Sequence, residues 1–477
     1  MAFVGRTREL AALQKHLDKV LRGTRLDRGT AVMIRGRRRV GKSRLAGEFV
    51  RRAALPYVHF QASRNTPPLE DLQHLRDAVV DSSLPGSASA HGIQPTTLSA
   101  ALQVLALALP DDSPSIVVID ELPWLLEGFA GGAGELQRAW DLTLSRKPVL
   151  LLLLGSDLSM MESLTRHDQP FHGRAAEMVL RALNPRDVAE LTGTSGMDAF
   201  DAHLITGGQP LVAEAWEHGM TLDDFLRAAV DDSSTALVVN GLRILESEFS
   251  ETSLARRVLT AIGGRGERTF SAVQQAATSL DPIPATSLSR TLHMLRAKRV
   301  VAFDEPLSMK KAPKDRRYRI DDPALRFWLA FVEPHLNEID AGRGDIAHAR
   351  VLSGYPAWRG RAVEPVVREA VWRLAPSTPW PDVKVVGNWW PRTNRPEVDL
   401  VGADDRPAHS ISFTGTIKWR ADKPLTSRDA GQLLADSRSV PGATENTAAV
   451  GVCPAGADDD ANFDLAWTAD DLLTAWR

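Results

Sequence analysis

The chain has 477 residues, 43% of them hydrophobic and 25% charged, with a formal net charge of -3. This length predicts about three or four domains, and the charge excludes a general attraction to nucleic acid or membranes, so either contact would need a local patch. The single cysteine, Cys453, excludes a disulfide framework and a cysteine-rich zinc site.

No part of the sequence is typical of a targeting or membrane segment. The N-terminal stretch "MAFVGRTREL" lacks an apolar signal-peptide core. The most apolar run, "PVLLLLLG" at 148–155, is far shorter than the ~20 residues needed to cross a bilayer. It is better interpreted as a buried strand, and we expect a cytoplasmic protein with no membrane partner.

The first part of the chain alternates helical patterns with apolar runs of strand length. Leucines at helical spacing predict a helix over 8–22, and "AVMIRG" at 31–36 predicts a strand that runs into a loop and a further helix. After a polar loop at 82–97, the runs at 115–126 and 148–156 predict strands buried on both faces. This order favours an α/β fold with a parallel sheet.

The second part of the chain is richer in helical patterns. Short helices are predicted from 184 to 248, and 251–320 contains three helical patterns followed by a strand pair near "RVVAFDE" and "RRYRI". The predicted domains are an α/β core at 1–183, a helical lid at 184–248, a third domain at 249–321, a helical connector at 322–358 and a small α/β domain at 359–477.

The stretch "GRRRVGKS" at 36–43 fits the phosphate-binding pattern G-x-x-x-x-G-K-[ST] and lies between a predicted strand and a predicted helix. Its glycines let backbone N–H groups surround a phosphate, Lys42 reaches the β and γ phosphates, and Ser43 can ligate magnesium. The pattern therefore predicts a site for ATP and Mg²⁺. The loop residues expected at the nucleotide are Gly36, Arg37, Arg38, Arg39, Val40, Gly41, Lys42, Ser43 and Arg44.

Further candidate residues follow the later strands. "IVVIDE" ends in Asp120, which can hold the water shell of Mg²⁺, and Glu121, which can polarise the attacking water. Ser156 is predicted either to sense the γ-phosphate and orient the water or to cap the next helix. Arg174 is predicted either to stabilise charge on the transferred phosphoryl group or to form a surface salt bridge.

These motifs together resemble the archaeal-type ATPases of the STAND branch of AAA-like P-loop NTPases. The likeness rests on "FVGRTREL" (3–10), "GRRRVGKSRL", "IDELPWL", "LLLLGSDLSMME", "FHGR" and "TGGQPLV" (206–212). It implies that Val4, Gly5 and Arg6 line an adenine pocket. It also implies that the turn from Gly208 to Pro210 brings a helical lid against the nucleotide.

The same resemblance implies a winged helix, because "YRIDDPALRFWLAFVEP" (318–334) follows such a domain in the family. The recognition helix would then be 285–299 and the wing 300–320. A surplus of basic residues there suits a DNA backbone, although an internal clamp or a solvated hairpin is the alternative. The basic residues are Arg290, Arg296, Lys298, Arg299, Lys310, Lys311, Lys314, Arg316, Arg317 and Arg319, against the acids Asp304, Glu305 and Asp315.

"EVDLVGADDRPAHSISFTGTIKWR" at 397–420 predicts two strands joined by a polar turn, with Glu397 and Asp399 on the first and Lys418 on the second. Two acids and a lysine are the groups that a metal-dependent nuclease needs. Trp389 and Trp390, just before this stretch, either stack on bases or pack in the core.

Members of the family often end in a PD-(D/E)XK nuclease-like domain, and the resemblance implies that Glu364, Asp399 and Lys418 take its helix acid, metal acid and lysine. Thr416 stands where the second metal acid belongs, and a neutral hydroxyl is a poor magnesium ligand. Asp436 on the next helix is a candidate replacement carboxylate. We therefore expect an impaired nuclease site.

The sequence favours an ATP-hydrolysing conformational switch that uses Mg²⁺. One alternative is a DNA nuclease licensed by ATP. Another is a module that binds DNA or a partner through a vestigial nuclease fold. Double-stranded DNA and a second copy of the chain are the candidate macromolecular partners.

Overall fold

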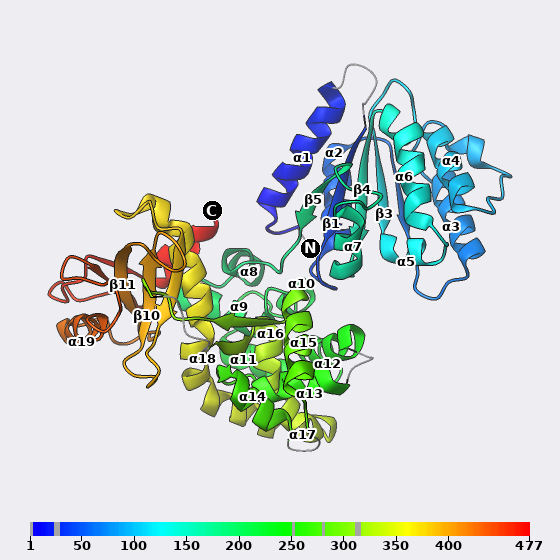
Figure 1. The fold of residues 1–477 in the computed structure, drawn as a ribbon. Coiled ribbons are helices and arrows are strands. Elements are labelled where there is room, and N and C mark those ends of the chain that lie inside the picture. The colour runs from blue at the N-terminus through cyan, green and yellow to red at the C-terminus, as the bar shows by residue number, and fades with distance from the viewer. Residues whose placement is uncertain (1–2, 23–28, 250–252, 279–281, 311–315) are drawn as a thin grey trace. The chain divides into compact units, whose positions relative to one another are not determined.

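The computed structural model describes residues 3–22, 29–249, 253–278, 282–310 and 316–477 (Figure 1). The chain divides into two compact units, Met1–Ala182 and Leu183–Arg477. Among the described residues, none of the helices combines the length and apolar character needed to cross a membrane.

The first unit is built on a parallel five-stranded sheet, so the predicted α/β class is confirmed. Side chains of β1 alternate between the two faces, with Met33 packing into one apolar core and Ile34 into the other. The strands lie in the order β2 (Tyr57–Gln61), β3 (Ser115–Asp120), β4 (Val149–Gly155), β1 (Thr30–Arg35) and β5 (Ala175–Val179).

Helices cover both faces of this sheet. Figure 1 shows α1 (Thr7–Arg22) and α2 (Lys42–Ala53) on one face, and α3 (Pro68–Val80), α4 (Leu98–Ala108) and α6 (Gly132–Leu142) on the other. Two shorter helices follow the carboxyl ends of β3 and β4; they are α5 (Leu122–Glu127) and α7 (Leu158–Thr165). Burial on both faces explains why β3 and β4 are continuous apolar runs.

The second unit begins with a group of helices around the buried aromatic side chains of Phe200, Trp216 and Phe225. The helices are α8 (Pro185–Thr192), α9 (Gly196–Thr206), α10 (Pro210–Ala213), α11 (Leu222–Ala229) and α12 (Ala236–Phe249). Asn184 and Thr221 cap α8 and α11 through their side-chain oxygens.

A small three-stranded antiparallel sheet follows, in the order β6 (Arg268–Thr269), β8 (Arg317–Ile320) and β7 (Val301–Asp304). The helices that accompany it are α13 (Ser253–Ile262), α14 (Phe270–Ala277) and α15 (Ala285–Ala297). The predicted recognition helix corresponds to α15, and Lys311, Lys314 and Asp315 of the predicted wing lie outside the described residues.

The chain then passes through α16 (Pro323–Phe327), a buried turn of wider helix at Trp328–Val332 and α17 (Leu336–Asp340) to α18 (Gly344–Leu374). Although α18 contains Pro356 and Pro365, it forms one helix of 31 residues. The predicted boundary between 358 and 359 therefore lies inside a helix that the connector and the last predicted domain share.

The last part is a mixed five-stranded sheet in the order β13 (Leu465–Trp467), β12 (Ala448–Val452), β11 (Ile411–Ile417), β10 (Val398–Ala403) and β9 (Val385–Trp389). The expected hairpin over 397–420 is the antiparallel pair β10 and β11, and β11, β12 and β13 run parallel. Two further helices belong to this part, α19 (Ser427–Ser437) and α20 (Ala469–Leu473).

Candidate functional site

The phosphate-binding loop lies between β1 and α2, as the pattern predicts. Gly36 must be a glycine because a Cβ there would lie 2.5 Å from the carbonyl oxygen of Leu180. Gly41 has a φ of 91°, a left-handed conformation that favours glycine, immediately before α2 begins at Lys42. The loop therefore leads directly into the N-terminus of α2, the end of a helix at which anions bind.

Lys42 is buried, and its ammonium group donates hydrogen bonds to the carbonyl oxygens of Gly36 (2.8 Å) and Arg37 (3.1 Å). The loop thus holds the lysine over its own backbone. Ser43, the next residue, donates a hydrogen bond from its hydroxyl to Oδ2 of Asp120. A hydroxyl and a carboxylate oxygen side by side are the donor set that Mg²⁺ accepts when phosphate and water complete its ligands.

Glu121 lies at the carboxyl end of β3 with a φ of 53°, a conformation uncommon for a residue with a side chain. Both the hydroxyl (2.8 Å) and the backbone N–H (3.2 Å) of Ser156 donate to Oε2 of Glu121. Since β3 and β4 are neighbours in a parallel sheet, their carboxyl ends bring these two residues together. Ser156 therefore orients the candidate catalytic carboxylate.

The N-terminal segment contacts the same loop. The guanidinium of Arg6, 5% exposed, donates to the carbonyl oxygen of Val40 (2.8 Å) and pairs with Glu9 (3.3 Å). The chain turns sharply before α1, because Gly5 and Arg6 both have positive φ, 71° and 60°. Val4 precedes this turn and is half-buried. The role of these three residues at an adenine ring stays a prediction.

The other arginines of the loop differ in their surroundings. Arg38 lies 5.5 Å from the ring centre of Trp124, a cation–π contact that reasoning from the sequence missed. The motif "IDELPWL" contains this tryptophan, three residues after Glu121. Arg39 has a φ of 66°, and Arg44 is exposed on α2.

Arg174 forms a bidentate ion pair with Asp141 of α6. Its Nε donates to Oδ1 (2.8 Å) and its Nη2 donates to Oδ2 (2.9 Å). The hydrogen bonds raise the pKa of Arg174 and hold that of Asp141 below its ordinary value. The salt-bridge interpretation of Arg174 therefore describes this structure. Its role at the phosphoryl group stays a prediction.

Gly208 and Pro210 belong to the second unit. Gly208 has a φ of 64°, and a Cβ there would lie 2.0 Å from the carbonyl oxygen of Leu183, so the turn requires glycine. Pro210 begins α10. The expected contact of this turn with a nucleotide stays a prediction.

The four residues of the candidate nuclease-like site come together on α18, β10 and the end of β11. Oδ2 of Asp399 accepts hydrogen bonds from the Thr416 hydroxyl (3.1 Å) and the Ile417 N–H (2.8 Å). Burial raises the pKa of Asp399, although those hydrogen bonds and the charge of Lys418 oppose it. Burial likewise raises the pKa of Glu364 to about 8.

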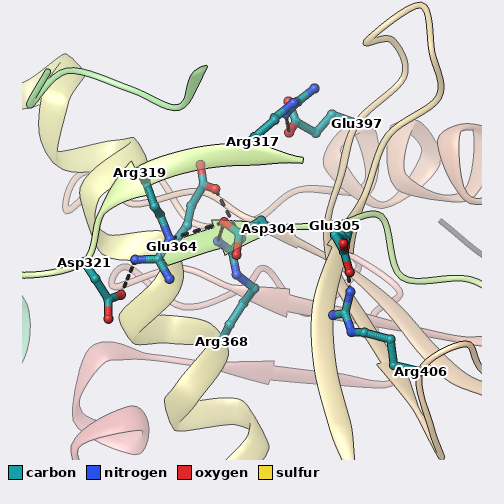
Figure 2. Close-up of polar contacts among 9 residues, drawn as sticks. All are labelled: Asp304, Glu305, Arg317, Arg319, Asp321, Glu364, Arg368, Glu397 and Arg406. Atoms are coloured by element: carbon teal, nitrogen blue, oxygen red, sulfur yellow. Dashed lines mark hydrogen bonds and ion pairs between the residues drawn. The ribbon is translucent and has the colours of Figure 1, made fainter. Parts of the chain in front are cut away.

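Arginines and further acids lie near Glu364, and sequence reasoning did not connect them with this site (Figure 2). Arg368, one helical turn after Glu364, lies 3.4 Å from both Glu364 and Asp304. Arg319 of β8 lies 3.3 Å from Asp304. Burial acts to raise the pKa of Asp304, but the two arginines outweigh it and hold that pKa below its ordinary value. The spacing of Glu364 and Arg368 at i and i+4 is the only sequence signal for these pairs.

The predicted wing arginines are engaged within the chain. Arg316 pairs with Glu305 at 2.6 Å, and Arg317 pairs with Glu397 at 2.7 Å. Arg317 also lies 3.9 Å from the ring centre of Trp390. Trp389 and Trp390 are both buried, at 6% and 3% exposure, as the core interpretation requires. Glu305, inside the wing, and Glu397, which the sequence comparison of charges omitted, thus balance these two arginines.

Comparisons with known proteins find matches to separate parts of the chain. Residues 2–152 match the AAA ATPase domain, and residues 328–432 match a family described as archaeal and bacterial proteins of unknown function. An uncharacterized protein of Methanocaldococcus jannaschii is 24% identical over 447 residues, which cover 91% of this chain and 90% of the relative.

Two solved structures are similar to the chain at low identity. The Walker-type ATPase PABY2304 of Pyrococcus abyssi is 18% identical with a TM-score of 0.49, over 69% of this chain and 96% of its own. The ORC2 protein of Aeropyrum pernix, solved as ADPNP–ADP complexes, is 17% identical with a TM-score of 0.48, over 73% of this chain and 96% of its own. From the sequence match and the geometry of its loop, the first unit carries an AAA-type ATPase domain.

Proposed function

We propose that the first unit binds ATP with Mg²⁺ and hydrolyses it slowly, and that the nucleotide state switches the conformation of the chain. The observation that carries this proposal is the hydrogen-bonded pair of Glu121 and Ser156 at the same sheet edge as Ser43 and Asp120. A domain that only sensed nucleotide would not need an oriented carboxylate there.

Each residue of the site has a distinct task. N–H groups of the loop bind the phosphates, and Lys42 exchanges its backbone carbonyls for phosphate oxygens. Ser43 and Asp120 would hold Mg²⁺, which supplies positive charge at the β and γ phosphates. Glu121 orients a water molecule and accepts its proton, while Ser156 fixes the carboxylate.

Phosphate release by the full chain tests this proposal. We expect Lys42→Ala to lose ATP binding, and Glu121→Gln to keep binding but lose at least about a hundredfold in turnover. Arg290→Gln, a change at an exposed residue of α15, is the matched control for preparation quality. Turnover at the wild-type rate in both site variants would trace the activity to a contaminant and end the proposal.

The resemblance to STAND ATPases supports a switch rather than a processive motor, because that branch uses hydrolysis to change conformation. Light scattering after size exclusion, with and without ATP, tests this part. If the chain is a switch, ATP should change the mass or hydrodynamic radius of the wild type. The Glu121→Gln variant, which hydrolyses ATP more slowly, should stay in that ATP-bound form. Identical profiles in every state would contradict it.

A DNA nuclease is the second candidate, favoured only by the meeting of Glu364, Asp399 and Lys418. Oδ2 of Asp399 accepts two hydrogen bonds from within the chain, and Thr416 carries no negative charge that would attract a metal ion. We therefore expect no plasmid cleavage with Mg²⁺ or Mn²⁺. Cleavage that Asp399→Ala abolishes would show that the site is active.

We assign contact with duplex DNA to the exposed face of α15, because Arg316, Arg317 and Arg319 of the wing pair with carboxylates. That face presents Ser289, Arg290 and His293 at helical spacing. Fluorescence anisotropy with labelled duplex should show weaker binding by Arg290→Glu. Equal binding by wild type and this variant would remove α15 from the proposal.

A further inference from the structure

A divalent cation is what the nuclease resemblance implies for the group around Asp399, but the residues do not fit one. Thr416 is neutral, Oδ2 of Asp399 accepts two hydrogen bonds, and Glu364 already faces the guanidinium of Arg368. Among the described residues, no three or more His, Cys, Asp or Glu side chains are placed to hold a metal ion. Glu364, whose pKa burial raises to about 8, is largely protonated at neutral pH. The neighbouring carboxylate of Asp304 needs cations beside it, because burying an unpaired carboxylate is costly.

Arginines lie beside acids in two separate sets, Arg368 and Arg319 around Asp304, and Arg317 beside Glu397 (Figure 2). Arg368 lies between Glu364 and Asp304, and Asp304 also faces Arg319. The side chains of Arg368 and Arg319 are 7% and 12% exposed. Both guanidinium groups are therefore largely removed from water, where ion pairs are screened least.

A second contact of the same kind lies at the start of β8. The guanidinium of Arg317 is held by the carboxylate of Glu397 (2.7 Å), by Oδ1 of Asn394 (3.0 Å) and by the face of Trp390. A planar cation with an ion pair, a polar acceptor and an aromatic face is recognised by shape as well as charge. The loop before β10 thus forms a fitted receptor for an arginine.

The chain just after β7 is fixed to the last sheet beside these arginines. Leu307 is fully buried in the core that Trp389 and Val398 also form, and its N–H donates to the carbonyl oxygen of Asn388 (2.8 Å). The N–H of Met309 donates to the carbonyl oxygen of Pro441 (3.1 Å). Apolar burial and backbone hydrogen bonds therefore act together with the ion pairs.

We propose that the acidic group beside the mixed sheet, Glu364, Glu397 and Asp399, serves as a docking site for arginine side chains, which we call the arginine dock. Arg368, which lies beside both Glu364 and Asp304, and Arg317 of β8, which pairs with Glu397, stand in place of a divalent cation and fasten the three-stranded sheet to the last part of the chain. The acidic group thus has a structural role that needs no metal ion. It pairs with arginines that would otherwise attract a nucleic-acid backbone. This inference stands whether or not the first unit hydrolyses ATP.

The first test measures metal binding to the full, nucleotide-free chain by the electron paramagnetic resonance of free Mn²⁺. The dock predicts no Mn²⁺ bound at this group, and the same titration curve for wild type and for Asp399→Asn. One equivalent of Mn²⁺ that Asp399→Asn abolishes, while Asp120→Asn in the first unit retains it, would overturn the proposal.

The second test measures amide hydrogen exchange at Leu307 and Met309. Arg317→Gln and Glu397→Gln each remove one partner of the Arg317–Glu397 ion pair. Both variants are expected to speed amide exchange at Leu307 and Met309 about tenfold. Glu397 is 39% exposed, so loss of its charge leaves the core intact. Arg227→Gln, a change at an exposed residue of α11, serves as the control that keeps the wild-type rate. Unchanged exchange in both pair variants would show that the contact fastens nothing.

Discussion

The hydroxyl of Ser156 lies 2.8 Å from Oε2 of Glu121, and the backbone N–H of the same serine donates to the same oxygen. Two donors on one oxygen leave Oε1 as the acceptor for a water proton. We predict that Ser156→Ala lowers turnover about tenfold by loosening this carboxylate, without changing the dissociation constant for ATP. Steady-state phosphate release and nucleotide titration separate the two effects.

Ser163 of α7 gives the matched control, because its hydroxyl bonds only the nearby carbonyl of Met160 in the described contacts. Ser163→Ala should behave as wild type in both assays. Weaker ATP binding by Ser156→Ala, with turnover preserved at saturation, would instead place this serine at the phosphates.

The pairing of Arg174 with Asp141 leads to a second prediction. The side chains are 30% and 39% exposed, so the ion pair is worth about 1 kcal/mol or less. We expect Arg174→Ala and Asp141→Asn to lower the free energy of unfolding alike by that small amount and to leave phosphate release unchanged. An arginine that stabilised the transferring phosphoryl group would behave differently, with a loss on the order of a thousandfold for Arg174→Ala alone.

The buried strands of the first unit could be predicted from sequence, but the edge strands could not. β3 and β4 are covered on both faces and are apolar throughout. β2, at one edge, alternates exposed and buried residues, and β5, at the other, reads "AAEMV" with no fully buried position. An edge strand has less cover, so its sequence need not be apolar.

The phosphate site could be predicted because its residues lie in two short motifs at the carboxyl ends of β1 and β3, two strands of one parallel sheet. The arginine dock could not, because Arg368 meets Asp304 across 64 residues of sequence and Arg317 meets Glu397 across 80. Opposite charges on separate elements carry no pattern in the sequence. The packing of Leu307 into the last sheet, with the backbone hydrogen bonds beside it, brings those elements together.

Leu307 is the apolar half of that contact and provides the third prediction. Its side chain has no exposed surface, so Leu307→Ala is expected to cost about 2–5 kcal/mol in the free energy of unfolding of the second unit. Met309→Ala, two residues on at a side chain 47% exposed, should cost about 0.5 kcal/mol or less. Urea unfolding followed by tryptophan fluorescence measures both, and equal losses would mean that Leu307 is not a core residue.

Asp201 gives a prediction for pH. This carboxylate of α9 is 1% exposed and accepts hydrogen bonds from the Tyr355 hydroxyl (3.0 Å) and Arg359 (2.9 Å) of α18. Burial raises its pKa from the ordinary 3.8 to about 6, although Arg359 and Tyr355 oppose the shift. The folded chain therefore holds a proton there that the unfolded chain releases, and this contribution to stability is lost as pH rises from about 4 to about 6.

Asp201→Asn should remove that contribution. We therefore expect the free energy of unfolding of wild type to fall relative to that of the variant as pH rises from about 4 to about 6. Asp224 supplies the opposite sign, because its hydrogen bonds to Thr221 in the cap of α11 hold its pKa below the ordinary value. The stability that Asp224 contributes is present above that ordinary value and is lost as pH falls, so Asp224→Asn should shift the difference the other way. Urea titrations at several pH values measure both slopes. A difference that does not change with pH between about 4 and 6 for Asp201→Asn would mean that burial does not set the protonation of Asp201.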